Sequence, residues 1–441
     1  MSVTSRNTLS SKKKILLGQL GRRGDCLYAT AIARQIKHDY PDCHLTWAIS
    51  SVYRSVIAGN PFVDAIWEVT QHSNEDQTGL WERFEGMALE RKKSGEYHEV
   101  FLTQVHPGNY QNYDGTVRSS LFRGYPHPIS VPIEPVVRLS DGEIKNVTRF
   151  ATENTLTESD TVILFECASS SNQSYVTPEF ARETANLVLK KRSGVKFVLS
   201  SDKPLDRALP NLVDGSVLAF MENAELTKYC SLLVGCSSGI SWLATADWAK
   251  PIPKVQVLAE KTGIYASMMG DALYFGLSTA HVLEVYGVST QRLANIILFI
   301  LDRGFAEAKE KYQTTIPINF DFYLRQLYSG IISKGQFAKV APALRSAQER
   351  FADDSFASKE LQIAINNVLI PYFDYRWKLL NEPERTAIRD VLGNLPGRLP
   401  NKARSIWGFL KLLKASCLGK NTRIARTLLK DILVRKKCPK I

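Results

Sequence analysis

The chain of 441 residues lacks the signatures of several large protein classes. It has no apolar run of about 18 residues, so no transmembrane helix is expected. No apolar segment follows the basic residues near its start, so no secretory signal is expected. Its seven cysteines are odd in number, scattered and without a Cys-x-x-Cys pair, which argues against disulfides and a zinc module. We therefore expect a cytoplasmic protein with reduced thiols, no metal and no cofactor.

Most of the chain also lacks net charge, although the total is +12. Residues 398–441 hold 13 Lys and Arg but one acid, and subtracting these from the totals of 56 and 44 leaves 43 of each sign elsewhere. One basic segment indicates one anionic partner surface. Residues 405–420 interleave Trp, Phe and Leu with Lys, which is typical of a helix on an anionic membrane. A helix packed on the body, with a charged outer face, is an equal alternative. Nucleic acid is not expected, because no known module is present.

Strand and helix patterns alternate through two successive stretches, which predicts an α/β protein with two doubly wound parallel sheets. Later residues have helical periodicity only. The predicted organisation is a disordered tail (1–13), a first Rossmann-like domain (14–150), a second (151–288), a helical extension (289–397) and a basic amphipathic tail (398–441).

Three glycines, Gly18, Gly21 and Gly24, separate the first predicted strand from a predicted helix. Their GxxGxxG spacing differs from GxGxxG, and no acid ends the second strand, so a dinucleotide site fits poorly. Asp25 follows the turn. It could serve as the helix N-cap, or as a general base at the carboxyl end of the strand, where α/β folds bind ligands.

A second turn, residues 234–239, joins a strand of the second domain to a helix. Backbone N–H groups at a helix N-terminus attract anions, and Ser hydroxyls add donors. An earlier Ser-rich turn is a weaker candidate of the same kind, and an ordinary Ser-capped turn is the alternative for both. The candidate phosphate-binding residues are Ser169, Ser170, Gly235, Ser237, Ser238 and Gly239.

His106 opens the polar loop 106–115, which follows a strand of the first domain. The Asn and Tyr side chains of such a loop could bind a sugar. A solvated loop without a binding role is the simpler interpretation.

Four stretches in this order resemble glycosyltransferase family 9, which includes the heptosyltransferases of lipopolysaccharide biosynthesis. They are YPDCHLTW at 40–47, NPFVD at 60–64, PEF at 178–180 and VGCSSGISWLA at 234–244. The resemblance covers about residues 14–300. It implies a GT-B fold, in which two Rossmann-like domains face a cleft, the first binding the acceptor and the second a nucleotide-sugar.

The same resemblance implies inverting transfer of a heptose or similar sugar, with Asp25 as the base. The implied acceptor is a glycolipid or glycan. The composition of residues 398–441, which the resemblance does not cover, separately suggests that they could hold the protein on the inner face of the cell membrane. The candidate acceptor-binding residues are Gly21, Arg22, Arg23, Gly24 and His106.

The sequence departs from the family pattern at three places. Ser237 stands where the family has Asp, Trp242 where it has His, and Gln173 and Ser174 lie near the place of an expected Lys. Either the donor differs, or the chain is a non-catalytic binding or scaffold protein. A transferase with a protein acceptor, docked by the helical extension, is a further alternative.

Overall fold

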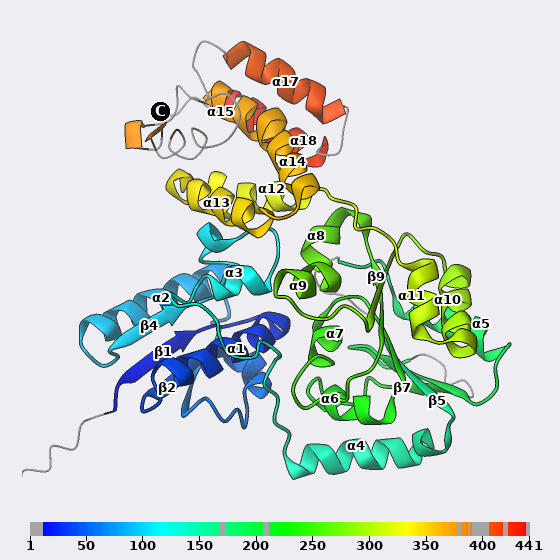
Figure 1. Ribbon diagram of the computed structural model, residues 1–441. Coiled ribbons are helices and arrows are strands. Elements are labelled where there is room, and N and C mark those ends of the chain that lie inside the picture. The colour runs from blue at the N-terminus through cyan, green and yellow to red at the C-terminus, as the bar shows by residue number, and fades with distance from the viewer. Residues whose placement is uncertain are drawn as a thin grey trace, which may run out of the picture.

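The structure is a computed structural model that describes residues 12–167, 173–205, 211–376, 381–383, 385–386, 389, 405–417 and 422–437. Two β-sheets stand side by side, and a group of helices lies above both (Figure 1). Nearly all of the predicted tail, residues 1–13, lies outside the described residues.

The first sheet has four parallel strands in the order β3-β2-β1-β4. They are β1 (Lys14–Gly18), β2 (His44–Ser50), β3 (Ala65–Val69) and β4 (Glu99–Leu102). The connecting helices are α1 (Arg23–Asp39), α2 (Gln77–Lys93) and α3 (Arg118–Phe122). The apolar runs of β1 and β2 are buried because helices cover both faces of the sheet.

The second sheet has six parallel strands in the order β10-β9-β8-β5-β6-β7. They are β5 (Thr161–Glu166), β6 (Val195–Ser200), β7 (Leu212–Asp214), β8 (Leu232–Gly235), β9 (Lys254–Leu258) and β10 (Val282–Tyr286). Their helices include α5 (Pro178–Leu189), α6 (Glu222–Leu226), α7 (Gly239–Leu243), α8 (Gly263–Ala266) and α9 (Met268–Tyr274). The predicted α/β class with two doubly wound parallel sheets is confirmed.

Helices also extend the second domain beyond its predicted residues on both sides. Val147 and Phe150 of α4 (Asp141–Glu153) are buried in one core with Leu164 of β5, so the predicted boundary at residue 150 falls inside a helix of this domain. Helices α10 (Thr290–Arg303) and α11 (Phe305–Tyr312) pack beside α5 and β10. The first helices of the predicted extension thus complete the second Rossmann-like unit.

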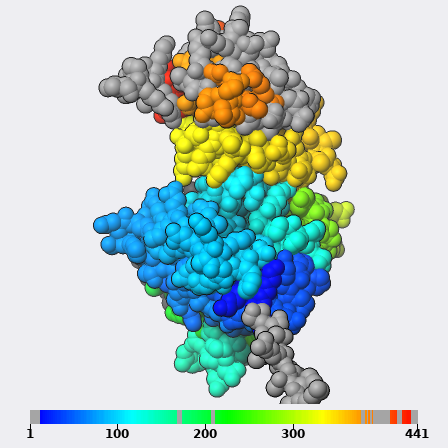
Figure 2. Space-filling model, turned by 90° about the vertical axis from the view of Figure 1, so that its left-hand side faces the viewer, coloured from blue at the N-terminus to red at the C-terminus, as the bar shows by residue number. Residues whose placement is uncertain are grey.

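The helical region proper begins at α12 (Asp321–Leu327) and continues through α13 (Val340–Arg350), α14 (Ser355–Ala364), α15 (Ile370–Arg376), α17 (Ser405–Cys417) and α18 (Thr422–Lys437). Two π-helical turns, Tyr328–Ile332 and Ile365–Leu369, extend α12 and α14. Figure 2 shows the yellow helices directly against the first domain, in blue and cyan. Within the described residues, no helix combines the length and apolar character needed to cross a membrane.

Candidate functional site

Each sheet has a topological switch point, where its strand order reverses. In the first sheet it lies between β1 and β4, and in the second between β5 and β8. Ligands of open α/β sheets bind outside the carboxyl ends of the strands at such points. The turn after β1 and the His106 loop flank the first switch point, and the turn after β8 lies at the second. The topology therefore brings the predicted acceptor residues together.

The turn after β1 is fixed by side-chain amides. Gln104 Oε1 accepts hydrogen bonds from the N–H groups of Leu20 (2.9 Å) and Gly21 (3.0 Å), and Gln19 Nε2 donates to the Gly21 carbonyl (2.6 Å). A Cβ at Gly21 would lie 2.5 Å from the ring of Tyr53. The close approach expected of this glycine is thus to the protein's own side chain.

Asp25 is not the helix N-cap, which is Arg22, but the third residue of α1. Its carboxylate reaches back to accept a hydrogen bond from the Arg22 N–H. Although the residue keeps some exposed surface, burial of its carboxyl group raises the pKa to about 7, against the lowering effects of that hydrogen bond and of the Arg22 charge. A carboxyl group with this pKa is suited to accepting a proton at neutral pH.

His106 lies near Arg22 of this turn, and burial together with the Arg22 charge lowers its pKa to about 4. Its ring meets the rings of Tyr110 and Tyr113 edge-on, with centroids 4.7 and 4.9 Å away. His106 Nδ1 and the Tyr113 hydroxyl are buried without a hydrogen-bond partner among the described residues. The loop is therefore largely packed, not solvated, and its histidine is neutral.

The helical region covers this loop. Ser346 Oγ donates to the carbonyl of Gln111 (3.4 Å), and a Cβ at Gly330 would lie 2.3 Å from the ring of Tyr110. The helical region, which the family resemblance does not cover, therefore packs against the loop that was predicted to bind the acceptor.

The two arginines of the turn differ in their surroundings. Arg23 spans the space between the domains, because its guanidinium lies 3.8 Å from Asp202 and 5.4 Å from the centre of the Phe220 ring. Arg22 is exposed, and its charge acts on Asp25 and His106. The turn after β1 of the first domain therefore lies close to residues of the second domain.

The predicted phosphate turn after β8 does bind an anion, but the anion belongs to the protein. The carboxylate of Glu166, the last residue of β5, accepts hydrogen bonds from the N–H groups of Cys236 (3.0 Å) and Ile240 (2.9 Å) and from the Ser241 hydroxyl (2.6 Å). The N–H groups of Ser238 and Ser241 point to it at 3.4 and 3.3 Å. The sequence shows that an acid ends this strand just before a Ser-rich turn, but it does not identify the turn that the acid contacts.

The remaining donor candidates are unequal. Ser237 is buried, with its N–H donating to Gln256 Oε1 (2.6 Å) and its hydroxyl to the Ala266 carbonyl (2.5 Å). A Cβ at Gly235 would lie 2.2 Å from Ser241 Oγ, so this glycine is required for internal packing. Ser238 and Gly239 are partly exposed. Ser169 and Ser170 lie outside the described residues.

Trp242, at the place of the family's His, packs between the domains. Its ring meets that of Tyr28 in α1 edge-on, at a centroid distance of 5.0 Å. The buried guanidinium of Arg118 lies 4.7 Å from the Tyr28 ring and 5.1 Å from the Trp242 ring, and 3.3 Å from the carboxylate of Asp271. Aromatic and ionic contacts thus join α1 and α3 of the first domain to α7 and α9 of the second.

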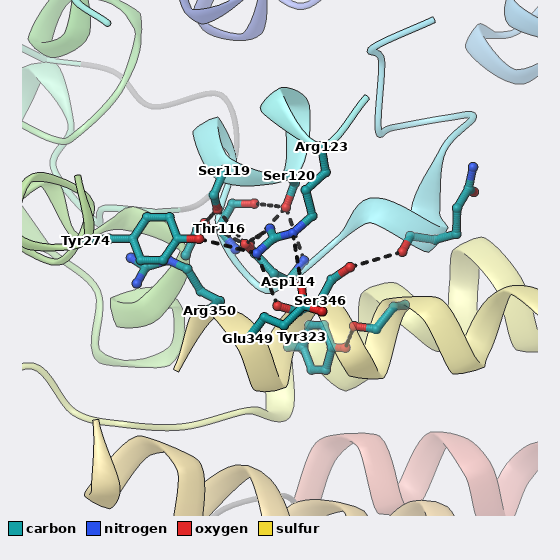
Figure 3. Close-up of polar contacts among 12 residues, drawn as sticks. Asp114, Thr116, Ser119, Ser120, Arg123, Tyr274, Tyr323, Ser346, Glu349 and Arg350 are labelled. Atoms are coloured by element: carbon teal, nitrogen blue, oxygen red, sulfur yellow. Dashed lines mark hydrogen bonds and ion pairs between the residues drawn. The ribbon is translucent and has the colours of Figure 1, made fainter. Parts of the chain in front are cut away.

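A polar junction joins all three parts of the molecule (Figure 3). Fully buried Asp114 accepts hydrogen bonds from the hydroxyls of Thr116, Ser119 and Ser120 and from Arg123. The same Arg123 donates to the carbonyl of Ser346 in α13 (3.3 Å).

From α13, Arg350 continues the junction into the second domain. It donates to the Gly270 carbonyl (2.8 Å) and lies 4.0 Å from the centre of the Tyr274 ring. Sequence reasoning missed the junction, because nothing in the chain pairs residues so far apart.

Two doubly wound parallel domains thus face each other through the carboxyl ends of their strands. The chain has a GT-B fold. No family model and no curated protein matches the sequence. Among solved structures, the chain is similar to a glycosyl transferase of family 9 from Veillonella parvula, with 13% identity, a TM-score of 0.47, and 73% of this chain and 97% of that one covered.

The chain is also similar to two further solved structures. The E. coli ADP-heptose LPS heptosyltransferase II has 14% identity and a TM-score of 0.42, and the match covers 66% of this chain and 100% of that one. A putative UDP-N-acetylglucosamine 2-epimerase from Listeria monocytogenes has 10% identity and a TM-score of 0.40, with coverage of 72% and 96%. The two facing parallel sheets of this chain confirm the GT-B fold that was predicted from the resemblance.

Proposed function

We propose that the protein transfers a sugar from a nucleotide-sugar to an acceptor hydroxyl, with inversion, and that Asp25 is the general base. The observation that carries this proposal is the Asp25 carboxyl group, which lies at the switch point of the first sheet with its pKa raised to about 7. Such a group is partly ionised at neutral pH and basic enough to accept a proton from an attacking hydroxyl.

The reaction needs no metal or cofactor in this proposal. The acceptor hydroxyl gives its proton to Asp25 while its oxygen forms a bond to the anomeric carbon of the donor sugar. The bond from that carbon to the diphosphate oxygen breaks, and its electron pair leaves with the nucleoside diphosphate. Attack from the side opposite the leaving group inverts the anomeric configuration.

The acceptor in this proposal is a glycolipid or glycan bound along the turn after β1. Neutral His106 would exchange a hydrogen bond with a sugar hydroxyl, and exposed Arg22 would face anionic groups. The sugar is heptose or a similar one. Glu166 already accepts hydrogen bonds from N–H groups at the start of α7. The donor diphosphate would therefore contact the partly exposed Ser238 and Gly239.

The test compares Asp25→Asn with the wild type on a panel of nucleotide-sugars, scored by nucleoside diphosphate release with and without glycan acceptors. Loss of a general base predicts a decrease of about 100-fold or more. Asp42→Asn is the matched control, because Asp42 is exposed and lies just before β2, at the opposite end of the sheet from Asp25. Wild-type turnover by a folded Asp25→Asn protein would contradict the role.

A second candidate is a non-catalytic protein that binds a nucleotide or glycan in the same fold. Two observations favour it: the Glu166 carboxylate occupies the amides that would bind phosphate, and Trp242 packs against Tyr28 between the domains. Donor hydrolysis distinguishes the candidates. A chain that binds a nucleotide-sugar but hydrolyses none of the panel, with Asp25 intact, supports the binding protein.

A further inference from the structure

The inner sides of α17 and α18 pack into the helical region. Leu412 of α17, and Leu428 and Ile432 of α18, are buried in the same core as α15. The Ile424 N–H donates to Asp321 of α12 (2.9 Å), which fixes the start of α18. The basic tail is therefore docked on the protein, and its membrane role can involve only the outward sides of these helices.

The only acid of this segment is withdrawn from that outward surface. Asp431 accepts hydrogen bonds from the Tyr372 hydroxyl (2.9 Å) and from Arg376 (3.3 Å), and its side chain is 7% exposed. No other acid occurs within residues 398–441, so the described outer sides of α17 and α18 carry positive charge only.

The outward side of α17 combines leucines with lysines. Leu410 and Leu413 are each 46% exposed, and Lys411 and Lys414 beside them are exposed as well. Residues separated by three or four positions share one side of a helix. The exposed leucines therefore lie within a basic surface instead of in the core.

The outward side of α18 repeats this composition. Arg423, Arg426, Lys430 and Leu433 are exposed at successive spacings of three, four and three residues, which places them in one stripe. Arg426 Nε also donates to the Ser416 carbonyl of α17 (2.9 Å), so the two helices are held together.

We propose that the outer surface of α17 and α18 binds an anionic lipid bilayer. The Lys and Arg side chains would contact headgroup phosphates, while Leu410, Leu413 and Leu433 enter the boundary with the acyl chains. Nucleic acid fits this surface less well, because phosphate contacts leave exposed leucines in water. The inference goes beyond sugar transfer and does not depend on it.

The experiment is co-sedimentation of the full chain with vesicles of phosphatidylcholine, alone or with phosphatidylglycerol as about a third of the lipid, at about 0.1 M salt. We expect binding to the mixed vesicles only. Lys411→Glu/Lys414→Glu/Lys430→Glu should weaken binding at least about tenfold. The control Lys145→Glu/Lys334→Glu/Lys359→Glu changes three exposed lysines outside these helices by the same charge and should bind as the wild type does.

A second variant tests the leucines. Leu410→Ser/Leu413→Ser keeps every charge, and it should also bind the mixed vesicles less tightly than the wild type. Equal binding by the charge-reversal variant and its control overturns the proposal, as does wild-type binding by the leucine variant. Stronger binding to duplex DNA or RNA than to the mixed vesicles overturns it in favour of a nucleic acid. All replaced side chains are exposed, and an unchanged melting temperature confirms the fold.

Discussion

The hydroxyl of Ser241 donates a 2.6 Å hydrogen bond to the carboxylate of Glu166, across the switch point of the second sheet. The same carboxylate accepts from backbone N–H groups at the start of α7, so the protein's own anion neutralises the site where a phosphate was expected. A donor diphosphate would therefore bind beside Glu166 or displace it.

Removing this carboxylate should free the turn for an external anion. Glu166→Ala leaves several buried N–H groups without an acceptor, and we expect a loss of about 3 kcal/mol in the free energy of unfolding. Phosphate at about 10 mM should restore part of the lost melting temperature, because an anion that binds only the folded state stabilises it. Thermal melting with and without phosphate measures both effects.

Glu284→Ala is the matched control, because Glu284 is a buried acid of the same sheet that accepts from Ser267 Oγ (2.9 Å) and the Met269 N–H (3.0 Å) away from the switch point. Equal phosphate effects on both variants would show that the turn after β8 has no special affinity for anions.

The raised pKa of Asp25 predicts a pH-dependent cost to stability. The folded protein holds this proton up to a pKa of about 7, against 3.8 in the unfolded chain, so wild-type stability falls as pH rises from about 4 to 7. Asp25→Asn removes this dependence. Each pKa unit corresponds to about 1.4 kcal/mol. Because the residue keeps some exposure, we expect Asp25→Asn to raise the free energy of unfolding at pH 8 by about 2 kcal/mol.

Chemical denaturation of both proteins at pH 4.5 and pH 8 tests this expectation. A difference in unfolding free energy that stays constant across that range would contradict the raised pKa, and with it the proposed base.

The lowered pKa of His106 should make the folded protein less stable as the pH falls. Burial holds its pKa near 4 in the folded protein, while the unfolded value is 6.5, so stability is lost as pH falls through that interval. His106→Phe keeps an aromatic ring beside Tyr113 and should reduce the acid-induced loss by about 2 kcal/mol. Melting from pH 7 to pH 4 measures it, and His72→Phe, at an exposed site, should leave the wild-type profile unchanged.

The junction in Figure 3 should hold the helical region on the two domains. Arg123→Met leaves the charge of buried Asp114 without its cation, which predicts a loss of about 3 kcal/mol and faster hydrogen exchange in α13. Asp114→Asn/Arg123→Met removes both charges and should lose less than the sum of its single variants.

Arg192→Met is the comparison for this experiment, because both partners of its ion pair with Asp302 are about half exposed and the expected effect is below about 1 kcal/mol. Wild-type exchange in α13 of the Arg123→Met protein would show that the junction does not fix the helical region.

Local sequence patterns predicted the start of one helix correctly and the start of another wrongly. Thr177 followed by Pro178 predicts a helix start, and in the structure Thr177 Oγ1 accepts from the Phe180 N–H (3.2 Å). The N-cap interpretation of Asp25 was wrong by three residues, because Arg22 is the N-cap and the helix begins at Arg23. Caps depend on backbone angles that composition alone leaves open.

The sequence by itself determined the two parallel sheets, the order of their elements and the place of Asp25 and His106 at strand ends, because apolar periodicity and turn residues act locally. Only the tertiary structure decided that Glu166 fills the predicted phosphate turn, that Trp242 packs on Tyr28, and that α13 joins both domains. Those contacts link residues 70 or more positions apart, and no local pattern encodes which distant partner a buried side chain will find.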